Sequence, residues 1–243
     1  MRNDDEMVGR LLTRRELVTL FGASAAAAMA SRLGAQAPSS TPVPACVVQP
    51  QQTEGPYFVD GKLLRSDIRS DPATGAVKPG APLALAVLVS EVNSGGTCTP
   101  IRNAQVDLWQ CDATGVYSDV KDPNFDTVGQ KFLRGHQMTD ASGKVNFVTI
   151  YPGWYPGRAV HIHFKVRTPA EAGSAYEFTS QFYFEERQTD RVFGREPYSA
   201  HTGQRTLNAR DRIYQRGGSQ LMLPITQSGS GYAATFNLGI RKA

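Results

Sequence analysis

Residues 160–166 read VHIHFKV, and apolar and polar side chains alternate along them without interruption. Such alternation is typical of a β-strand with one buried face, because successive side chains of a strand point to opposite sides. On this strand His161 and His163 project from the same face. Ile162 and Phe164 project from the other face. The segment therefore predicts a strand that holds two imidazoles side by side, which is half of a possible metal site.

Strand patterns recur along the chain and are separated by turns. Residues 83–89 are a nearly continuous apolar run, which suits a buried strand, and residues 104–110 alternate with a period of two. Asn-Ser-Gly-Gly at 93–96 and Asp-Ala-Ser-Gly at 140–143 favour turns. Further strands are expected at 145–150 and 178–184. With 23 Gly, 15 Pro and no long helical periodicity, the sequence predicts an all-β fold: a β-sandwich of mostly antiparallel strands with long active-site loops.

Composition narrows the classes of protein to which the chain can belong. Its 243 residues suit one domain or at most two small ones, and 40% apolar with 20% charged residues suit a packed core. The net charge is only +4, and no basic run is interleaved with aromatic residues, so nucleic-acid binding is not expected. Four histidines and three cysteines leave room for few metal sites built from these residues.

The first 37 residues have the features of an export signal. Arg14 and Arg15 stand just before residues 17–30, an uncharged run that is too short to span a bilayer, which takes about 20 residues. Ala35-Gln36-Ala37 follows as a small-residue cleavage motif. The pattern resembles a twin-arginine (Tat) signal peptide. It predicts export to the periplasm or the cell exterior, with no membrane segment left after cleavage.

The remaining chain is expected to contain an extended arm over residues 38–82 and the β-sandwich over residues 83–243. The start of the arm is rich in Pro, Ser, Thr and Gln and has no period. Because the predicted destination is oxidising, two of the three cysteines are expected to pair, and all three pairings are open. The cysteines are Cys46, Cys98 and Cys111.

Two tyrosines stand in loops where a metal could use them. Tyr155 lies in the Pro- and Gly-rich loop 151–158, just before the two histidines, and Tyr117 lies in the turn 112–118. A tyrosine beside Pro or Gly is usually a structural anchor. Its pKa of about 10 makes it a ligand only for a hard, highly charged cation that stabilises the phenolate, such as a ferric ion.

Four segments taken together resemble the intradiol ring-cleavage dioxygenases, a family that includes the protocatechuate 3,4-dioxygenases and the catechol 1,2-dioxygenases. The resemblance covers residues 46–190 and is closer to the protocatechuate type and to secreted stand-alone members. The chain before Leu83 is too short for the helical dimerisation domain of the catechol type. The segments are TEGPYF (53–58), WQCDATGVY (109–117), YPGWYPGRAVHIHF (151–164) and SQFYF (180–184).

The resemblance implies a cofactor, a reaction and roles for individual residues. Arg158 matches an arginine that stabilises negative charge on the bound substrate ring, and Gln181 matches a residue near that ring. Tyr155 would leave the metal as the substrate binds. The implied reaction is cleavage of a catecholic ring by O2 to a cis,cis-muconate-type product, a step of aromatic catabolism. The implied Fe(III) ligands are Tyr117, Tyr155, His161 and His163.

Other residues near these motifs have weaker claims. Trp154 and Tyr57 are expected either to line the pocket or to pack. His136 is interpreted as a structural or neighbouring group and not as a fifth ligand, and His201 as part of an exposed loop. Residues 208–214 are expected to form one or two helical turns without a functional role.

Two alternatives to the dioxygenase were weighed. A cupin-type Fe(II) or Zn(II) site also begins with His-x-His, but it needs a glutamate closer than Glu171, which stands eight residues after His163. The second alternative is a non-catalytic, transthyretin-like binding or adhesion module with the same sandwich. Such a module has no need for two tyrosines, an arginine and two histidines in this order.

Overall fold

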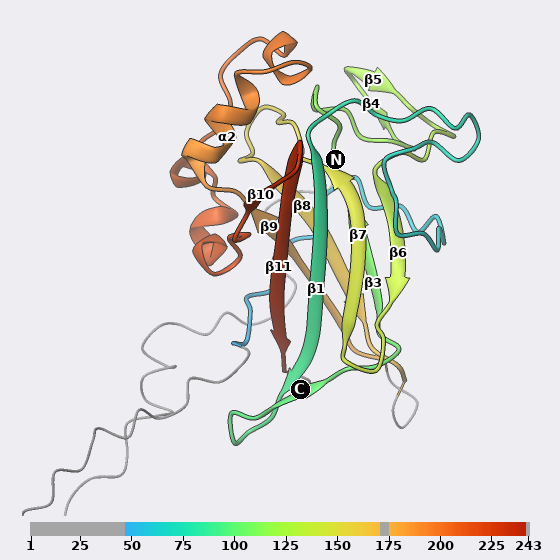
Figure 1. The fold of residues 1–243 in the computed structure, drawn as a ribbon, viewed down its shortest axis with the longest axis vertical. Coiled ribbons are helices and arrows are strands. Elements are labelled where there is room, and N and C mark those ends of the chain that lie inside the picture. The colour runs from blue at the N-terminus through green and yellow to red at the C-terminus, as the bar shows by residue number, and fades with distance from the viewer. Residues whose placement is uncertain (1–46, 171–174, 242–243) are drawn as a thin grey trace, which may run out of the picture.

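The computed structural model describes residues 47–170 and 175–241. The predicted signal peptide, the first part of the predicted arm and Cys46 therefore lie outside the described residues. Figure 1 shows the two β-sheets of the sandwich, with helical segments beside one edge and a small hairpin near the other. Within the described ranges, no helix is long and apolar enough to cross a membrane.

The first sheet is built around β1 (Pro82–Val92). This strand pairs antiparallel with β7 (Lys144–Ile150) along most of its length and with β2 (Cys98–Pro100) at its end. It pairs parallel with β11 (Gly231–Ile240), and β10 (Thr226–Ser228) forms the outer edge. The sheet thus contains one parallel pair, between β1 and β11, among antiparallel ones.

The second sheet contains the strand that bears the two histidines. Its order is β6-β3-β8-β9, and every neighbouring pair is antiparallel. The expected all-β sandwich of mostly antiparallel strands is therefore confirmed. The strand bounds are Arg134–Met138 for β6, Gln105–Trp109 for β3, His161–Arg167 for β8 and Glu177–Tyr183 for β9.

The core lies between the two sheets, and the apolar half of β8 enters it. Ile162 and Phe164 are fully buried in the main apolar cluster. The Phe164 ring stacks on Phe182 of β9 at 4.2 Å between centroids, and Phe182 in turn meets Phe236 of the other sheet at 4.9 Å. The apolar run 83–89 in β1 is not buried throughout, since Ala84 is exposed. The alternation along β8 therefore directs the histidines away from the core.

The described part of the arm, residues 47–81, covers the outer face of the second sheet. Its contacts run from one edge strand to the other, so the arm closes over the face that bears the histidines. In order from β9 to β6, these contacts are Gln52 with Thr179, Glu54 with Lys165, Phe58 with Trp109 and Leu64 with His136.

The connections add one short helix, α2 (Glu186–Phe193), which the sequence analysis did not predict. Only Thr189 and Val192 of this helix are buried, so its sequence lacks the apolar stripe from which a helix is usually predicted. Residues 208–214 do form helical turns, as expected. The remaining elements are β4 (Lys121–Asp122), β5 (Phe125–Asp126), η1 (Tyr198–Ala200), η2 (Asn208–Arg210), η3 (Tyr214–Arg216) and η4 (Gly218–Gln220).

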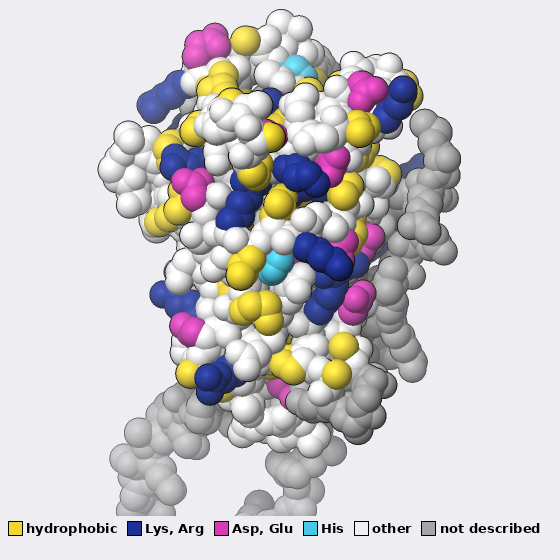
Figure 2. Space-filling model, turned by 90° about the vertical axis from the view of Figure 1, so that its right-hand side faces the viewer, with side chains coloured by type: hydrophobic (Ala, Val, Ile, Leu, Met, Phe, Trp, Pro, Cys, Tyr) yellow, Lys and Arg dark blue, Asp and Glu magenta, His cyan; other side chains and the backbone are white. Residues whose placement is uncertain are grey.

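The cysteines and the surface complete the description. Cys98 takes part in a disulfide, whereas Cys111 is buried and free, which removes the two predicted pairings that include Cys111. On the face shown in Figure 2, basic and acidic side chains lie among one another and hydrophobic side chains are scattered between them.

Candidate active site

The two histidines of β8 aim their Nε2 atoms at the same point. These atoms lie 2.9 Å apart, and the hydroxyl oxygen of Tyr155 lies 3.4 Å from the Nε2 of His161. Tyr117 completes the group, with its ring centroid 5.7 Å from that of Tyr155 and 6.2 Å from that of His163. The structure thus brings together the four side chains that were predicted as metal ligands.

Backbone contacts determine which nitrogen of His161 is available. Its Nδ1 lies 2.6 Å from the carbonyl oxygen of Ala159, which can only accept, so Nδ1 carries the proton and Nε2 keeps a free lone pair. Burial, and then the charge of Arg158, lower the pKa of His161 to about 3. Burial and the neighbouring His161 lower the pKa of His163 well below its usual range. Both imidazoles are therefore neutral, which is the form that binds metal ions.

Tyr117 is the most deeply enclosed of the four. Its side chain is fully buried, and its hydroxyl oxygen has no hydrogen-bond partner among the described residues. Burial, and then the nearby Tyr155, raise the pKa of Tyr117 well above its usual range. A buried hydroxyl is normally hydrogen-bonded, so this orphaned oxygen needs a partner, and a highly charged cation would both satisfy and deprotonate it.

The donor set fits a hard trivalent cation better than a structural zinc ion. Two phenol oxygens join two neutral imidazoles, and two phenolates would offset most of a 3+ charge. Nowhere in the described ranges do three His, Cys, Asp or Glu side chains gather in a way that could hold a metal. A metal bound by His161 and His163 would therefore need ligands of another kind, and the phenol oxygens of the neighbouring tyrosines are suited to that role.

Arg158 lies beside this group and is held on two sides. Its Nε donates to the Oδ2 of Asp211 at 3.1 Å, and its Nη2 donates to the Oε1 of Gln181. Its Nη1 is buried and has no partner within the described residues. Burial alone would lower the pKa of Arg158, but nearby tyrosines and the Asp211 carboxylate raise it above its usual value. The guanidinium is thus a fixed positive charge with one free nitrogen.

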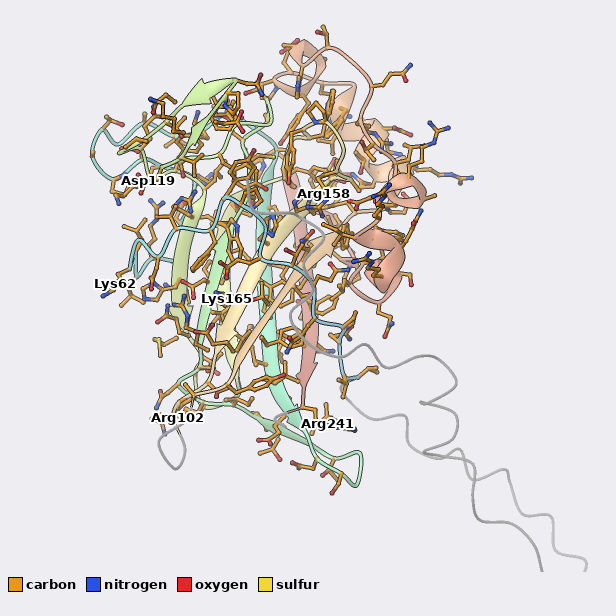
Figure 3. The ribbon with its side chains drawn as sticks, turned by 180° about the vertical axis from the view of Figure 1, so that it is seen from behind. Lys62, Arg102, Asp119, Arg158, Lys165 and Arg241 are labelled. Atoms are coloured by element: carbon orange, nitrogen blue, oxygen red, sulfur yellow. The ribbon has the colours of Figure 1, made fainter. Side chains whose placement is uncertain are left out.

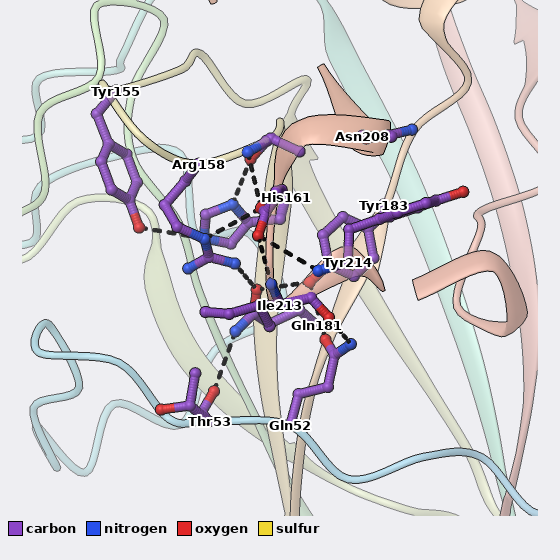
Figure 4. A network of polar contacts seen from close by, with 12 residues as sticks. Gln52, Thr53, Tyr155, Arg158, His161, Gln181, Tyr183, Asn208, Ile213 and Tyr214 are labelled. Carbon is purple, nitrogen blue, oxygen red and sulfur yellow. Dashed lines mark hydrogen bonds and ion pairs between the residues drawn. The ribbon is translucent and has the colours of Figure 1, made fainter. Parts of the chain in front are cut away.

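Gln181 supports Arg158 through a network of side-chain hydrogen bonds. Its Nε2 donates to the carbonyl oxygen of Thr53 at 3.0 Å. Its Oε1 accepts from Arg158 and from the hydroxyl of Tyr183, the latter at 3.1 Å. Figure 4 shows this network, in which Tyr183 also donates to Gln52. Gln181 thus lies within hydrogen-bonding distance of the guanidinium, and its expected place near the substrate ring stays a prediction.

Aromatic rings enclose the predicted ligands. Tyr57 of the arm stacks on Tyr117 at 4.5 Å between centroids and meets the edge of Tyr155 at 6.0 Å. Trp109 of β3 stacks on His163 at 4.9 Å with the two rings nearly parallel. Tyr57 therefore belongs to the site. Trp109 begins one of the motifs in the sequence, but the β3–β8 register that sets it opposite His163 was not predictable.

The other two histidines have different surroundings. The ring of His201 stacks on Trp154 at 4.3 Å, and His201 is only partly exposed although its neighbours Ala200 and Thr202 are exposed, as expected for this loop. The stack forms because the chain after η1 folds back over the loop that bears Trp154. His136 lies on β6, two strands away from β8, and its backbone pairs with Leu63 and Arg65 of the arm. These contacts make it an anchor for the arm.

Three comparisons relate the chain to known proteins. A family model described as "Dioxygenase" matches residues 53–216. The beta chain of protocatechuate 3,4-dioxygenase from Burkholderia cepacia is 31% identical over 183 residues, covering 70% of this chain and 71% of that protein. The solved intradiol ring-cleavage dioxygenase from Tetranychus urticae is 28% identical, with a TM-score of 0.68, over 81% of this chain and 95% of that one.

A second solved structure is similar over the same share of the chain. It is the dioxygenase domain of a dioxygenase carbohydrate-binding protein fusion from Streptomyces sp. SirexAA-E. That domain is 28% identical, with a TM-score of 0.58, and the match covers 81% of this chain and 100% of the domain.

Proposed function

This chain belongs to the intradiol ring-cleavage dioxygenase family, and from that premise we propose that it cleaves a catecholic ring with O2 at a bound Fe(III). The product would be a cis,cis-muconate-type diacid. One observation carries the proposal: two neutral imidazoles and two phenols converge, and the buried phenol of Tyr117 has no hydrogen-bond partner among the described residues. The proposed ligands are Tyr117, Tyr155, His161 and His163.

The two proposed tyrosine ligands differ in exposure, which suggests different tasks. Bound Fe(III) would supply a Lewis-acidic centre for the catechol oxygens. Tyr117 is fully buried and has no room to leave, whereas Tyr155 is only half-buried and lies on a loop rich in Pro and Gly. Tyr155 is therefore the residue that can swing away and accept a proton at Oη from an arriving catechol hydroxyl.

Arg158 is the residue that can stabilise charge on the substrate. Its free Nη1 is buried, and hydrogen bonds inside a site of low dielectric are stronger than the same bonds in water. The guanidinium is already fixed by Asp211 and Gln181, so it need not reorganise as charge develops on a ring oxygen. The surrounding rings of Tyr57 and Trp109 would help to exclude water.

The test combines metal analysis with turnover. Purified protein should contain about one iron per chain and show the red-brown absorption of a ferric phenolate. It should consume O2 with catechol, hydroxyquinol or protocatechuate and release a muconate-type product. Chelation should abolish both colour and turnover, and Fe(III) should restore them. A colourless protein with zinc, an extradiol semialdehyde, or no O2 uptake, as a binding module would give, contradicts the proposal.

We also propose that residues 1–37 direct export through the Tat pathway, which rests on the sequence pattern described above. Replacing Arg14 and Arg15 by lysines should leave uncleaved precursor in the cytoplasm. Cell fractionation of the variant beside the parent decides this, and unimpaired export would overturn the proposal.

A further inference from the structure

A carboxylate from the far end of the chain lies directly behind the candidate site. Asp211 follows η2 in the segment that the sequence analysis left without a functional role, and only 1% of its side chain is exposed. It faces Arg158, whose side chain is 6% exposed, across 3.1 Å from Oδ2 to Nε. Figure 4 shows Arg158 within the polar network to which this pair belongs.

Every hydrogen bond that Asp211 accepts comes from a fixed group. Its Oδ2 accepts from the Nε of Arg158 and from the backbone N–H of Ala159, the latter at 2.8 Å. Its Oδ1 accepts from the backbone N–H groups of Ile213 at 2.7 Å and Tyr214 at 3.3 Å. One oxygen therefore shapes the local turn, and the other holds the loop that precedes β8.

The same carboxylate reaches one of the predicted metal ligands through a single residue. Ala159 donates its N–H to Asp211 and accepts the Nδ1–H of His161 at its carbonyl oxygen, 2.6 Å away. A shift of Asp211 would therefore move the backbone that orients His161 as well as the guanidinium of Arg158. No other described carboxylate is hydrogen-bonded to Arg158.

The contacts of Arg158 leave a single nitrogen for a ligand. Nε is occupied by Asp211 and Nη2 by Gln181, whereas the buried Nη1 has no partner within the described residues. An arginine held by its Nε and one Nη cannot rotate about its last bonds without breaking both contacts. The direction of Nη1 is therefore determined by Asp211 and Gln181.

We propose that Asp211 is a positioning residue for ring cleavage: its carboxylate holds Arg158 so that Nη1 alone meets the anionic oxygen of the substrate. It also balances the buried guanidinium charge before substrate binds. The inference rests on the proposed function, because it needs a substrate whose oxygen gains negative charge in the site. Asp211 acts through Arg158 and does not itself touch the substrate.

The test compares two buried aspartates that differ in their distance from the site. Asp71 is also buried, and its carboxylate accepts the backbone N–H groups of Ala73, Thr74 and Lys131 far from Arg158. Asp211→Asn should lower kcat about 10- to 100-fold, with a much smaller change in KM and unchanged iron content. Asp71→Asn should lower the melting temperature but leave kcat within about 2-fold of the parent.

A double variant separates positioning from simple loss of packing. Arg158→Gln and Arg158→Gln/Asp211→Asn should have the same kcat, because Asp211 has nothing left to position once the guanidinium is absent. The double variant removes both buried charges together, so it should fold even if Asp211→Asn does not. A crystal structure of Asp211→Asn should show the guanidinium of Arg158 displaced from its parent position.

The outcomes distinguish this inference from the proposed function. A parent protein without ring-cleaving activity overturns both. An active parent with an Asp211→Asn variant no more impaired than Asp71→Asn overturns only the inference. A double variant at least tenfold slower than Arg158→Gln does so as well, since Asp211 would then act independently of Arg158.

Discussion

Four polar side chains alternate along the outer face of strand β8, and the environment at one end of the strand differs from that at the other. The first end bears His161 and His163, and buried polar atoms around it lack partners within the described residues. The second end bears Lys165 and Arg167, which are both ion-paired. Figure 3 shows Arg158 beside the first end and Lys165 farther along the sheet. The unpartnered atoms around the first end are Tyr117 Oη, His163 Nδ1, Arg158 Nη1 and Trp109 Nε1.

The paired end fastens the arm to the sheet. Lys165 pairs with Glu54 of the arm, and its Nζ lies 4.2 Å from the ring centroid of Phe58, also in the arm. Arg167 lies 3.3 Å from Asp107 of β3 and 3.2 Å from Glu177 of β9. These contacts account for the charges at this end and leave none for a ligand.

The difference between the two ends of β8 separates residues that serve a ligand from residues that stabilise the fold. Native proteins satisfy nearly all buried polar groups, so a cluster of unsatisfied ones signals a missing partner. The same alternation and the same arm cover both ends of β8, so the fold alone does not cause the contrast. We infer that the histidine end is reserved for a ligand and that the cation end stabilises the fold.

The largest expected effect on iron content and kcat is that of replacing His163, the second histidine of β8. His163→Ala should lower iron content and reduce kcat more than about 100-fold, since even residues that only support a metal ligand usually cost 10- to 100-fold. Lys165→Met, two residues along the same face, is the matched control and should keep iron and kcat. Metal analysis and O2 uptake measure both. If Lys165→Met lost iron as well, the contrast between the two ends would fail.

A second comparison uses the two arginines. Arg158→Lys should reduce kcat about 10- to 100-fold, because a lysine cannot hold Asp211 and Gln181 and still present a free donor. Arg167→Lys should leave kcat within about 2-fold, because its partners are carboxylates outside the site. Steady-state kinetics decide this, and equal losses in the two variants would contradict the assignment.

The third expected effect is on the free energy of unfolding, and it concerns Lys165 at the paired end of β8. Lys165→Met should lower the free energy of unfolding by about 1–3 kcal/mol, because it leaves Glu54 without its buried partner. The Glu54→Gln/Lys165→Met double variant should recover part of this loss. Urea denaturation of the two variants and the parent measures it. An unchanged midpoint for Lys165→Met would show that the ion pair does not fasten the arm.

The smallest effect is at Asp107, and it depends on pH. Burial raises the pKa of Asp107 above its usual range although Arg167 opposes the shift. A raised pKa means that the folded chain holds this proton more tightly than the unfolded chain. Asp107 therefore lowers the free energy of unfolding as pH rises. The decrease begins near pH 3.9, the approximate pKa of aspartate in the unfolded chain, and is complete above the raised pKa in the folded chain.

Asp107→Asn removes that contribution. The difference in unfolding free energy between the variant and the parent should therefore shift in favour of the variant as pH rises through this window, and it should be no more than about 1 kcal/mol at pH 7. Urea denaturation at several pH values between 3.5 and 7 tests the prediction. A difference that stays constant, or that shifts in favour of the parent as pH rises, would show that the sign is wrong.

Much of the candidate site was predictable because its signals are local. The positions of His161 and His163 on one face follow from the period of two along β8, and the structure confirms this arrangement. Tyr117, Tyr155 and Arg158 were identified from short motifs that resemble the family, and the structure brings all three to the histidines. Their roles in iron binding and catalysis stay predictions.

The supporting residues were not predictable, because their contacts join distant parts of the chain. Asp211 lies 53 positions after Arg158, and Tyr183 lies 131 positions after Gln52. Their segments carry no period or motif that relates one to the other. For the same reason the sequence did not reveal the hydrogen bond between Gln181 and Arg158, which only the fold shows.

The sequence by itself determined the sandwich and the identity of the donors, because alternation and turn residues act between near neighbours in the chain. Only the tertiary structure decided which polar groups are paired and which are not. Pairing depends on which side chains the folded sheets and the arm bring within hydrogen-bonding distance. The contrast between the histidine end of β8, with its unpartnered atoms, and the paired end therefore arises from the packing of the folded molecule.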